Sequence, residues 1–369
     1  MSLPAKNVIL FLFVSLTTAI LVALFNYVVD PLRLFGRFEL GRHWYSADSR
    51  MQDAGLIRSQ DFDAIFMGTS LAVHFRQSDI DRQLGVRSLK LAMTGSTSVE
   101  QSFVLNFALR HHPKLVIWEM DEWIFRDAPD VDSDTYLPAD LYRMNVRGIA
   151  GYLLNLDTAR ESMWILLRGF KPLEIIAHGL AAAQYLKFYE ENVNEINTLP
   201  TYTDLSTHYN SAKALVSFAH YLKFPQEIGA GYDYEAMVRN FERDAADLIA
   251  KNPGVRFDIY FPPYSILQFV AMRDASPATL KIVYDFSVYA NRRLAQFPNV
   301  RLYDFREAKE VTHDLNNYSD VVHHSPAIDL KVLSWLAEEK YVVDREAPVA
   351  SLERLKAQVE VFQTSNIER

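Results

Sequence analysis

The stretch Ile65-Phe66-Met67-Gly68-Thr69-Ser70-Leu71 decides the fold class. Its apolar residues lie between Asp63 and Gly68, and a short apolar run with such bounds is typical of a buried strand in an α/β sheet. Gly68 allows the sharp turn that a strand-to-helix elbow needs. We expect Ser70 at the carboxyl edge of this strand, where open α/β sheets bind ligands, and at the start of the next helix. A serine in that place is either a nucleophile or an ordinary helix cap.

Four further apolar segments are predicted to be strands of the same sheet. They are Val86 to Met93, Leu115 to Trp118, Phe257 to Phe261 and Val300 to Tyr303. Ser276-Pro277 and Ser325-Pro326 each have the serine cap and first-turn proline of a helix start. Strands separated by helices of this size predict a parallel sheet covered on both faces, which is an α/β fold. Between about residues 124 and 231 the alternation stops, and we interpret that segment as a largely helical insertion within one domain.

The composition is that of a globular chain with a substantial core. Of its 369 residues, 49% are hydrophobic and 23% are charged. The net charge of −8 provides no basic footprint, so we expect no nucleic-acid partner. The chain has no cysteine, which excludes disulfides and thiolate metal sites.

The N-terminal segment is predicted to be an uncleaved transmembrane anchor. No charged residue occurs between Asn7 and Val29. At about 1.5 Å per residue this helix spans roughly 34 Å, enough to cross a bilayer. No small-x-small cleavage site follows the apolar run, so it does not read as a signal peptide. We expect residues 8–29 to contact the lipid bilayer.

The side of the membrane on which the rest of the chain lies is not fixed by charge. Lys6 precedes the anchor, and three arginines follow it, namely Arg33, Arg37 and Arg42. A simple count of these residues favours a cytoplasmic location, but long domains are exported regardless of such counts. The expected organisation is an anchor at residues 1–30, a connector at 31–60 and an α/β domain at 61–369.

Asp320-Val321-Val322-His323 follows the fifth predicted strand and places an acid three residues before a histidine. A serine nucleophile needs a base that accepts its proton and a group that orients the base. At this spacing Asp320 can reach Nδ1 of His323 and leave Nε2 for Ser70, which is expected at the same edge of the sheet. The alternative is that both residues only help to cap the helix that starts at Ser325-Pro326.

Gly95 follows the second strand at that edge. A glycine there lets a backbone N–H approach a tetrahedral oxyanion without obstruction by a side chain. An ordinary strand-to-helix turn is the other explanation for it.

The order of these blocks resembles that of the SGNH/GDSL hydrolase superfamily. Gly-Thr-Ser follows the first strand, Gly95 the second, and Asp-x-x-His the last. The resemblance implies a three-layer, flavodoxin-like fold with Ser70 as nucleophile and His323 and Asp320 as the rest of a triad. It also implies that the backbone N–H groups of Ser70 and Gly95 form part of an oxyanion hole. One block departs, because Glu119-Met120-Asp121-Glu122 stands where the family usually has Gly-x-Asn-Asp. An ionised carboxylate cannot donate to an oxyanion, so Asp121 is expected to be a substrate contact or merely solvated.

A narrower resemblance links the chain to membrane-anchored SGNH-like proteins of bacterial envelopes. It rests on the N-terminal helix, the Asn-Tyr-x-x-Asp-Pro junction from Asn26 to Pro31, and the terminal Asp-x-x-His-His-Ser-Pro. Relatives of this type include the teichoic-acid D-alanyl transfer protein and the alginate O-acetylation proteins. The resemblance implies an enzyme of the cytoplasmic membrane whose α/β domain is extracytoplasmic, often beside a membrane-bound O-acyltransferase.

The function expected from this resemblance is serine O-acyl transfer to an envelope polysaccharide or related polymer. The alternatives are an SGNH esterase or deacetylase, and a non-catalytic anchored scaffold or glycan-binding protein. Tyr264 and His324 are further possible substrate contacts. The adjacent pair His323-His324 is not expected to bind a metal, because neighbouring side chains diverge and no ligand cluster accompanies them. No cofactor is expected.

Overall fold

A computed structural model describes residues 3–36, 49–127, 137–168 and 208–363. The chain divides into two compact units. The first comprises Met1–Gln60 with Thr135–Glu195, and the second comprises Asp61–Asp134 with Ile196–Arg369.

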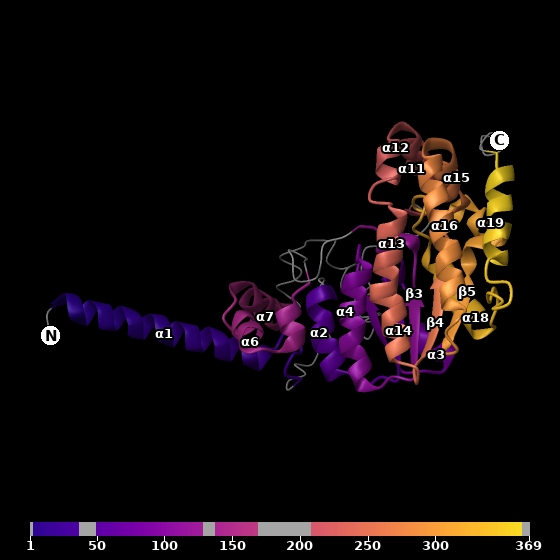
Figure 1. The fold of residues 1–369 in the computed structure, drawn as a ribbon. Helices are drawn as coiled ribbons and strands as arrows, with labels where there is room; N and C mark the ends of the chain where they lie inside the picture. Colours follow the sequence, from indigo (N-terminus) through magenta and orange to yellow (C-terminus); the bar gives the residue numbers. More distant parts are fainter. Residues whose placement is uncertain (1–2, 37–48, 128–136, 169–207, 364–369) are drawn as a thin grey trace. The chain divides into compact units, whose positions relative to one another are not determined.

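The second unit contains a parallel sheet of five strands (Figure 1). The strand order is β2-β1-β3-β4-β5. The strands are β1 (Ala64–Gly68), β2 (Ser88–Ala92), β3 (Leu115–Glu119), β4 (Arg256–Phe261) and β5 (Val300–Asp304). This order is that of doubly wound sheets of the flavodoxin-like kind, in which the switch point lies between β1 and β3. The predicted α/β fold with a parallel sheet is confirmed.

Helices cover both faces of this sheet, as the sequence predicts. One face packs against α3 (Gln77–Leu84) and α18 (Pro326–Ala337). The other face packs against α4 (Ser98–Ala108), α13 (Tyr234–Phe241), α14 (Asp247–Lys251) and α16 (Pro277–Leu294). A π-helical turn at Glu242–Ala246 joins α13 to α14. The expected starts of α16 and α18 after Ser276 and Ser325 are confirmed.

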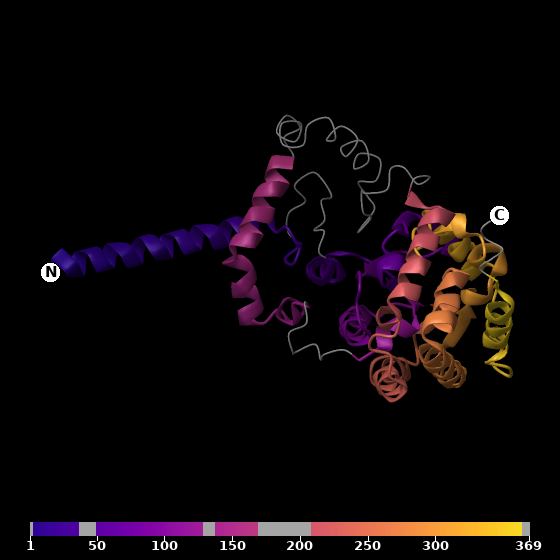
Figure 2. The same ribbon diagram turned by 90° about the horizontal axis from the view of Figure 1, so that it is seen from above.

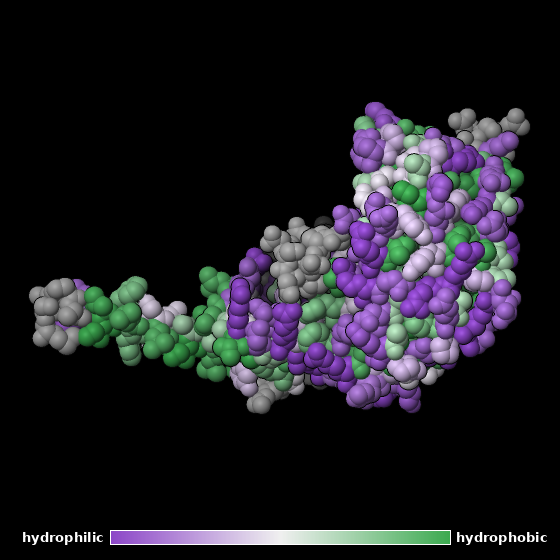
Figure 3. Space-filling model, viewed as in Figure 1, coloured by the Kyte–Doolittle hydropathy of each residue, from purple (hydrophilic) through white to green (hydrophobic). Residues whose placement is uncertain are grey.

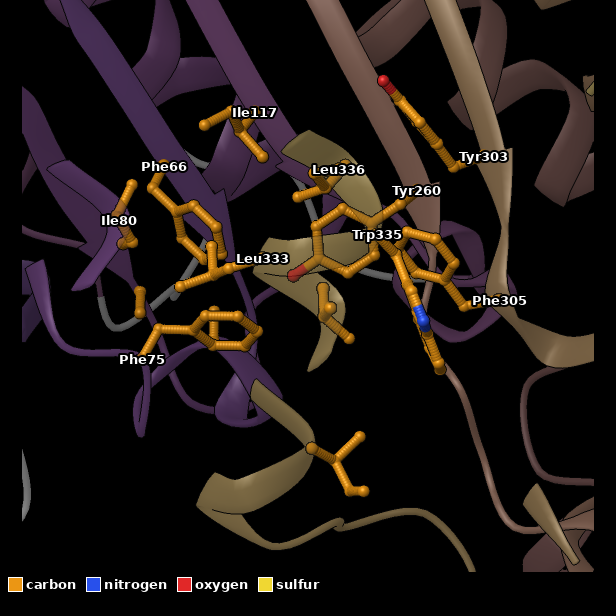
Figure 4. Close-up of a cluster of buried hydrophobic side chains, with 14 of the residues drawn as sticks. Phe66, Phe75, Ile80, Ile117, Tyr260, Tyr303, Phe305, Leu333, Trp335 and Leu336 are labelled. Carbon is orange, nitrogen blue, oxygen red and sulfur yellow. The ribbon is translucent and has the colours of Figure 1, made fainter. Parts of the chain in front are cut away.

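The core between the sheet and α18 is aromatic (Figure 4). The rings of Phe66 on β1 and Phe75 pack with centroids 4.8 Å apart. Tyr260 on β4 and Leu333 on α18 belong to the same buried cluster. Because side chains alternate across a strand, Ile65 points to the face of the sheet opposite to that of Phe66. Both Ile65 and Phe66 are fully buried. This two-sided burial explains why β1 reads as a continuous apolar run.

The other α-helices that the structure describes in the second unit lie around this sandwich. They are α11 (Ser211–Lys223), α12 (Pro225–Ile228), α15 (Ile266–Ala275), α17 (Lys309–Thr312) and α19 (Ala350–Val361). Helix α15 packs against α11 and α19 and carries most of a second apolar cluster. The sequence did not predict α15, because it is apolar on nearly every side and shows no amphipathic period.

The described residues of the first unit form one long apolar helix and four shorter ones. They are α1 (Leu3–Val29), α2 (Ser49–Ser59), α5 (Ala139–Arg143), α6 (Val146–Leu153) and α7 (Leu156–Arg168). Within α1, Lys6–Val29 has a mean hydropathy of 2.8, so this helix is long and apolar enough to span a membrane. Figure 3 shows its hydrophobic surface along its length.

The division into units differs from the expected organisation. The predicted connector at 31–60 contains α2 and belongs with α1 in the first unit. The predicted insertion at about 124–231 is divided, because α5 to α7 pack with α1 and α2, whereas α11 and α12 pack in the second unit. Residues 169–207 of that insertion lie outside the described ranges. Polar contacts between distant segments, which no local pattern reveals, hold the first unit together.

Candidate active site

The turn after β1 presents Ser70 at the carboxyl edge of the sheet. Ser70 begins a single 3₁₀ turn, Ser70–Ala72. A Cβ on Gly68 would lie 2.5 Å from the Ala72 Cβ and 3.0 Å from the Glu119 Cβ. Gly68 does not have a positive φ. The glycine is therefore required by close packing between this turn and β3, and not by the backbone freedom that we expected.

Ser70, His323 and Asp320 form a continuous hydrogen-bonded chain. The Ser70 Oγ lies 2.9 Å from Nε2 of His323. The His323 Nδ1 lies 2.6 Å from Oδ2 of Asp320. The other oxygen of Asp320 accepts the backbone N–H groups of Val322 and His323, each at 2.7 Å. The structure thus brings together the three residues that the sequence singled out, and the imidazole is oriented by an acid on its own loop.

The charged groups around His323 favour an imidazole that accepts a proton. Burial alone would lower the pKa of His323, but its hydrogen bond to Asp320 and the negative charges of Asp320 and Asp121 outweigh burial and raise it. Burial would raise the pKa of Asp320, but the hydrogen bond and charge of His323 and two backbone N–H groups lower it. Asp320 is therefore ionised at neutral pH and stabilises the protonated imidazole.

The loop that carries Asp320 and His323 is fixed at both ends. Tyr318 and His324 form an antiparallel bridge, and the Ser319 N–H donates to the His323 carbonyl at 3.0 Å. The Tyr318 hydroxyl donates to the carbonyl of Pro263, after β4, at 2.7 Å. The imidazole is thereby placed by contacts to the neighbouring loop as well as by Asp320.

Two backbone N–H groups border the same site. Gly95 follows β2 with a φ of +65°, a conformation that favours glycine. Within the described part of the chain, neither the Ser70 N–H nor the Gly95 N–H donates to another protein group. Both residues line the cavity described below. Their N–H groups are available for a negatively charged oxygen.

Glu119, at the end of β3, orients the turn before the serine. Its Oε1 accepts the Thr69 N–H at 3.1 Å and the Thr69 hydroxyl at 2.8 Å. Burial, with the charge of Asp121, raises the pKa of Glu119 to about 8. Glu119 is therefore neutral in the folded protein at pH 7. Sequence reasoning missed this role, because it depends on β1 lying beside β3.

Asp121 and Tyr264 form a second buried pair at the cavity. The Tyr264 hydroxyl donates to Oδ2 of Asp121 at 2.6 Å, and the Ile124 N–H donates to Oδ1 at 3.1 Å. Burial raises the pKa of Asp121 to about 6, although the hydrogen bond from Tyr264 opposes this shift. Both residues line the cavity, so the structure places these two expected contacts at the site.

Glu122, the next acidic residue, is structural. It receives hydrogen bonds from Arg306 and, at 2.8 Å, from Ser287 on α16. Arg306 also binds both oxygens of Asp304 at the end of β5, each at 2.7 Å. This fully buried network ties the ends of β3 and β5 to α16. Glu122 also lines the cavity, but its carboxylate is engaged by Arg306 and Ser287.

A cavity of about 350 Å³ opens beside the Ser70 hydroxyl. Its lining includes aromatic and acidic side chains, namely Trp123, Tyr221, Tyr232, Tyr264 and Asp121. It also includes apolar side chains, namely Leu71, Phe269, Met272, Val283 and Val322. The sequence did not predict the contributions of α11, α15 and α16, because no residue there has the pattern of a catalytic motif.

His324 is not placed at this cavity, contrary to its expected role as a possible substrate contact. Its side chain is buried, and its Nδ1 lies 3.2 Å from Oδ1 of Asp329 on α18. Since consecutive residues of an extended segment point to opposite sides, the orientation of His323 toward Ser70 turns His324 into the core. Among the described residues, no group of three His, Asp or Glu side chains converges as a metal site.

Comparison of the sequence with protein families and with curated proteins found no match.

Proposed function

We propose that this chain is a membrane-anchored, extracytoplasmic serine O-acyltransferase of the SGNH type, acting on an envelope polysaccharide or a related polymer. The observation that carries the proposal is the chain of contacts from Ser70 Oγ to His323 Nε2 and from His323 Nδ1 to Asp320. The strand order and the position of these residues at the carboxyl edge of the sheet agree with the resemblance on which the proposal rests.

The proposed reaction has two steps. The Ser70 Oγ attacks the acyl carbonyl while His323 Nε2 takes its proton, and the N–H groups of Ser70 and Gly95 bind the resulting oxyanion. The tetrahedral intermediate collapses, His323 protonates the leaving group, and the acyl group remains esterified to Ser70. An acceptor hydroxyl then gives its proton to His323 and attacks the acyl-enzyme. The second tetrahedral intermediate collapses with cleavage of the bond between the acyl carbon and Ser70 Oγ, and His323 returns the proton to that oxygen. The products are the acylated polymer and free Ser70.

The residues that line the cavity are of two kinds, which suit the two halves of such a substrate. Apolar side chains such as Phe269, Met272 and Val283 suit the acyl chain. Aromatic side chains such as Trp123 and Tyr232 suit a sugar ring that stacks on aromatic faces. The anchor α1 holds the enzyme at the membrane, where we expect a membrane-bound O-acyltransferase partner to supply the acyl group.

A fluorophosphonate probe tests the proposed nucleophile directly. The full-length, detergent-solubilised chain is expected to form a covalent adduct at Ser70, mapped by mass spectrometry of the digested protein. Ser70→Ala abolishes the adduct, whereas Ser334→Ala, at a serine of α18 whose hydroxyl contacts only the exposed Glu338, leaves it intact. An unlabelled wild-type protein would support the alternative of a non-catalytic scaffold or glycan-binding protein.

Hydrolysis is a second candidate because solvent reaches the triad. The side chains of His323 and Asp320 are 37% and 33% exposed, so water has access to an acyl-enzyme. A p-nitrophenyl ester assay separates the two activities. A transferase releases p-nitrophenol in a stoichiometric burst and turns over only when a polymer acceptor is added. Rapid steady turnover in buffer alone would favour an esterase or deacetylase.

A further inference from the structure

The end of α1 is joined to α6 and α7 by a buried asparagine. The side-chain amide of Asn26 donates to the carbonyls of Leu153 at 2.9 Å and Asn155 at 3.2 Å. Its oxygen accepts the hydroxyl of Ser162 on α7 at 3.0 Å. Asn26 is fully buried. These three hydrogen bonds use both polar atoms of its side chain, and they hold the two helices against the last turn of α1.

Asp30 makes a second junction one turn later. Its carboxylate accepts the N–H groups of Leu34, Phe35 and Gly36 at 3.0, 2.8 and 3.1 Å, and the hydroxyl of Tyr152 on α6 at 3.0 Å. Asp30 is also the first charged residue after Lys6. If α1 spans a bilayer, Asp30 marks the level at which the chain leaves the hydrocarbon, and α6 is fixed at that level.

The two helices run across the end of α1 instead of along it (Figure 2). If α1 spans a bilayer, helices that cross its end, as α6 and α7 do, lie along the membrane surface at the level where α1 ends. The loop between α6 and α7 is also held there, because Asn155 is one of the two residues whose carbonyls Asn26 binds.

Helix α7 exposes an apolar stripe that no described residue covers. Leu156, Met163 and Leu166 are 77%, 48% and 42% exposed. At about 100° per residue these three side chains lie within an arc of roughly 80° on the helix. Leu154, just before α7, and Val146 on α6 are exposed as well.

The other faces of α7 have different characters. Thr158 and Ser162 are buried and lie on the side that faces α1. The charged residues Asp157, Arg160 and Glu161 occupy the arc between the apolar stripe and the buried side. A helix that separates an apolar stripe from a charged stripe is typical of helices that lie in the membrane interface.

We propose that α6 and α7 form an in-plane membrane-contact element, with the apolar stripe of α7 inserted among the lipids of the bilayer that α1 spans. The inference rests on the proposed membrane anchoring by α1. The occupant is lipid because the junctions at Asn26 and Asp30 fix the stripe at the level where α1 leaves the bilayer, and an apolar surface at that level meets lipid first. The element gives the anchor a second attachment that resists tilting and rotation of α1.

The chain has no native cysteine, so a single introduced cysteine can be labelled without background labelling at other positions. The full-length chain carrying one NBD-labelled cysteine is placed in nanodiscs of phosphatidylcholine and phosphatidylglycerol, with or without spin-labelled lipids. The test positions are Leu156→Cys and Met163→Cys, and the matched controls on the charged stripe are Asp157→Cys and Glu161→Cys. Leu16→Cys, at the middle of α1, reports the anchor itself.

We expect lipids spin-labelled near the headgroup to quench the two test positions at least twofold more than the two controls. Equal quenching of test and control positions, with Leu16 still quenched by deep spin labels, overturns this inference and leaves the anchor standing. Loss of quenching at Leu16 as well overturns the anchoring. If the stripe is shielded from soluble quenchers only in native membranes, a protein partner covers it, and lipid is excluded as the occupant. Fluorophosphonate labelling of Ser70 in every variant reports the proposed enzymatic function separately.

Discussion

The carboxyl group of Glu119 binds both the backbone N–H and the hydroxyl of Thr69 through a single oxygen, at 3.1 and 2.8 Å. Thr69 directly precedes Ser70, so a residue on β3 determines the direction of the turn that follows β1. The contact is fully buried and joins the two strands at the switch point of the sheet. The position of the nucleophile thus depends on groups that take no part in the proposed chemistry.

Glu119→Gln is expected to change how stability depends on pH. In the folded protein Glu119 keeps its proton up to about pH 8, whereas its unperturbed pKa is 4.5. Because the folded state holds this proton more tightly, wild-type stability falls as pH rises from 4.5 through 8. Glutamine has no proton to lose, so the variant should lose less stability between pH 6 and 8.

Denaturant midpoints of the solubilised chain at pH 6 and 8 measure this difference. Asp121, with a pKa of about 6, contributes a similar loss mainly below pH 6 in both proteins and does not mask the effect. A decline between pH 6 and 8 that is the same in wild type and Glu119→Gln would show that Glu119 does not carry it.

Gly68→Ala is expected to displace the Ser70 turn. The added Cβ would lie 2.5 Å from the Ala72 Cβ, a distance that only movement of the turn relieves. Such overpacking typically lowers the free energy of unfolding by about 1–3 kcal/mol. Because the displaced turn carries Ser70, the rate of fluorophosphonate labelling should fall as well, even under conditions in which the variant stays folded. Ala72→Gly removes the nearest atom, so the double variant Gly68→Ala/Ala72→Gly should recover part of the labelling rate. No recovery would mean that the contact with Glu119 dominates.

Asp121→Asn is expected to shift the pH profile of acylation. The negative charge of Asp121 contributes to the raised pKa of His323, and the neutral imidazole is the form that accepts the Ser70 proton. Removing the charge lowers the pKa of His323, so the acid limb of the profile should move to lower pH. Pre-steady-state labelling rates between pH 4.5 and 8.5 measure the shift.

Asp121→Ala is the matched control for that variant. It removes the same charge without adding an amide donor, so it should move the acid limb equally. If asparagine also donates to the oxyanion, its plateau rate exceeds that of the alanine variant. An acid limb that stays in place in both variants would contradict the electrostatic coupling to His323.

The adjacent histidines are expected to respond oppositely to substitution. The His323 side chain is 37% exposed and contacts Ser70, whereas that of His324 is 2% exposed and faces Asp329. His323→Gln should slow labelling by about 10³-fold or more with little change in stability. His324→Gln should instead destabilise the fold, by about 3 kcal/mol if an uncompensated buried carboxylate remains. Labelling rates and denaturant midpoints of both variants test this contrast, and a reversed pattern would contradict the assignment.

The strands and the contact between Asp320 and His323 were predictable because each depends on a local pattern. Buried strands such as β3 read as short apolar runs, and Asp320 binds His323 within one loop. Because both Ser70 and His323 were expected at the carboxyl edge of the sheet, their proximity was predictable too. The contact of Glu119 with Thr69 was not predictable, since nothing local indicates that β1 and β3 are neighbours.

Other parts of the chain escaped prediction for related reasons. Helix α15 is buried on most sides, so its sequence lacks the period that identifies a helix. The first unit depends on Asn26, whose partners lie more than 120 residues away. The burial of His324 was not predictable, because it depends on the register of the short bridge between His324 and Tyr318.

Asp320 and His323 lie on one loop after β5, but their partner Ser70 follows β1, and two strands separate β1 from β5 in the sheet. The Ser70–His323 pair therefore forms only once β3 and β4 have assembled between them. During refolding, the moment at which Ser70 becomes reactive toward a covalent probe would mark the closure of the whole sheet. The reactivity of Ser70, the proposed nucleophile, would then report when the fold is complete.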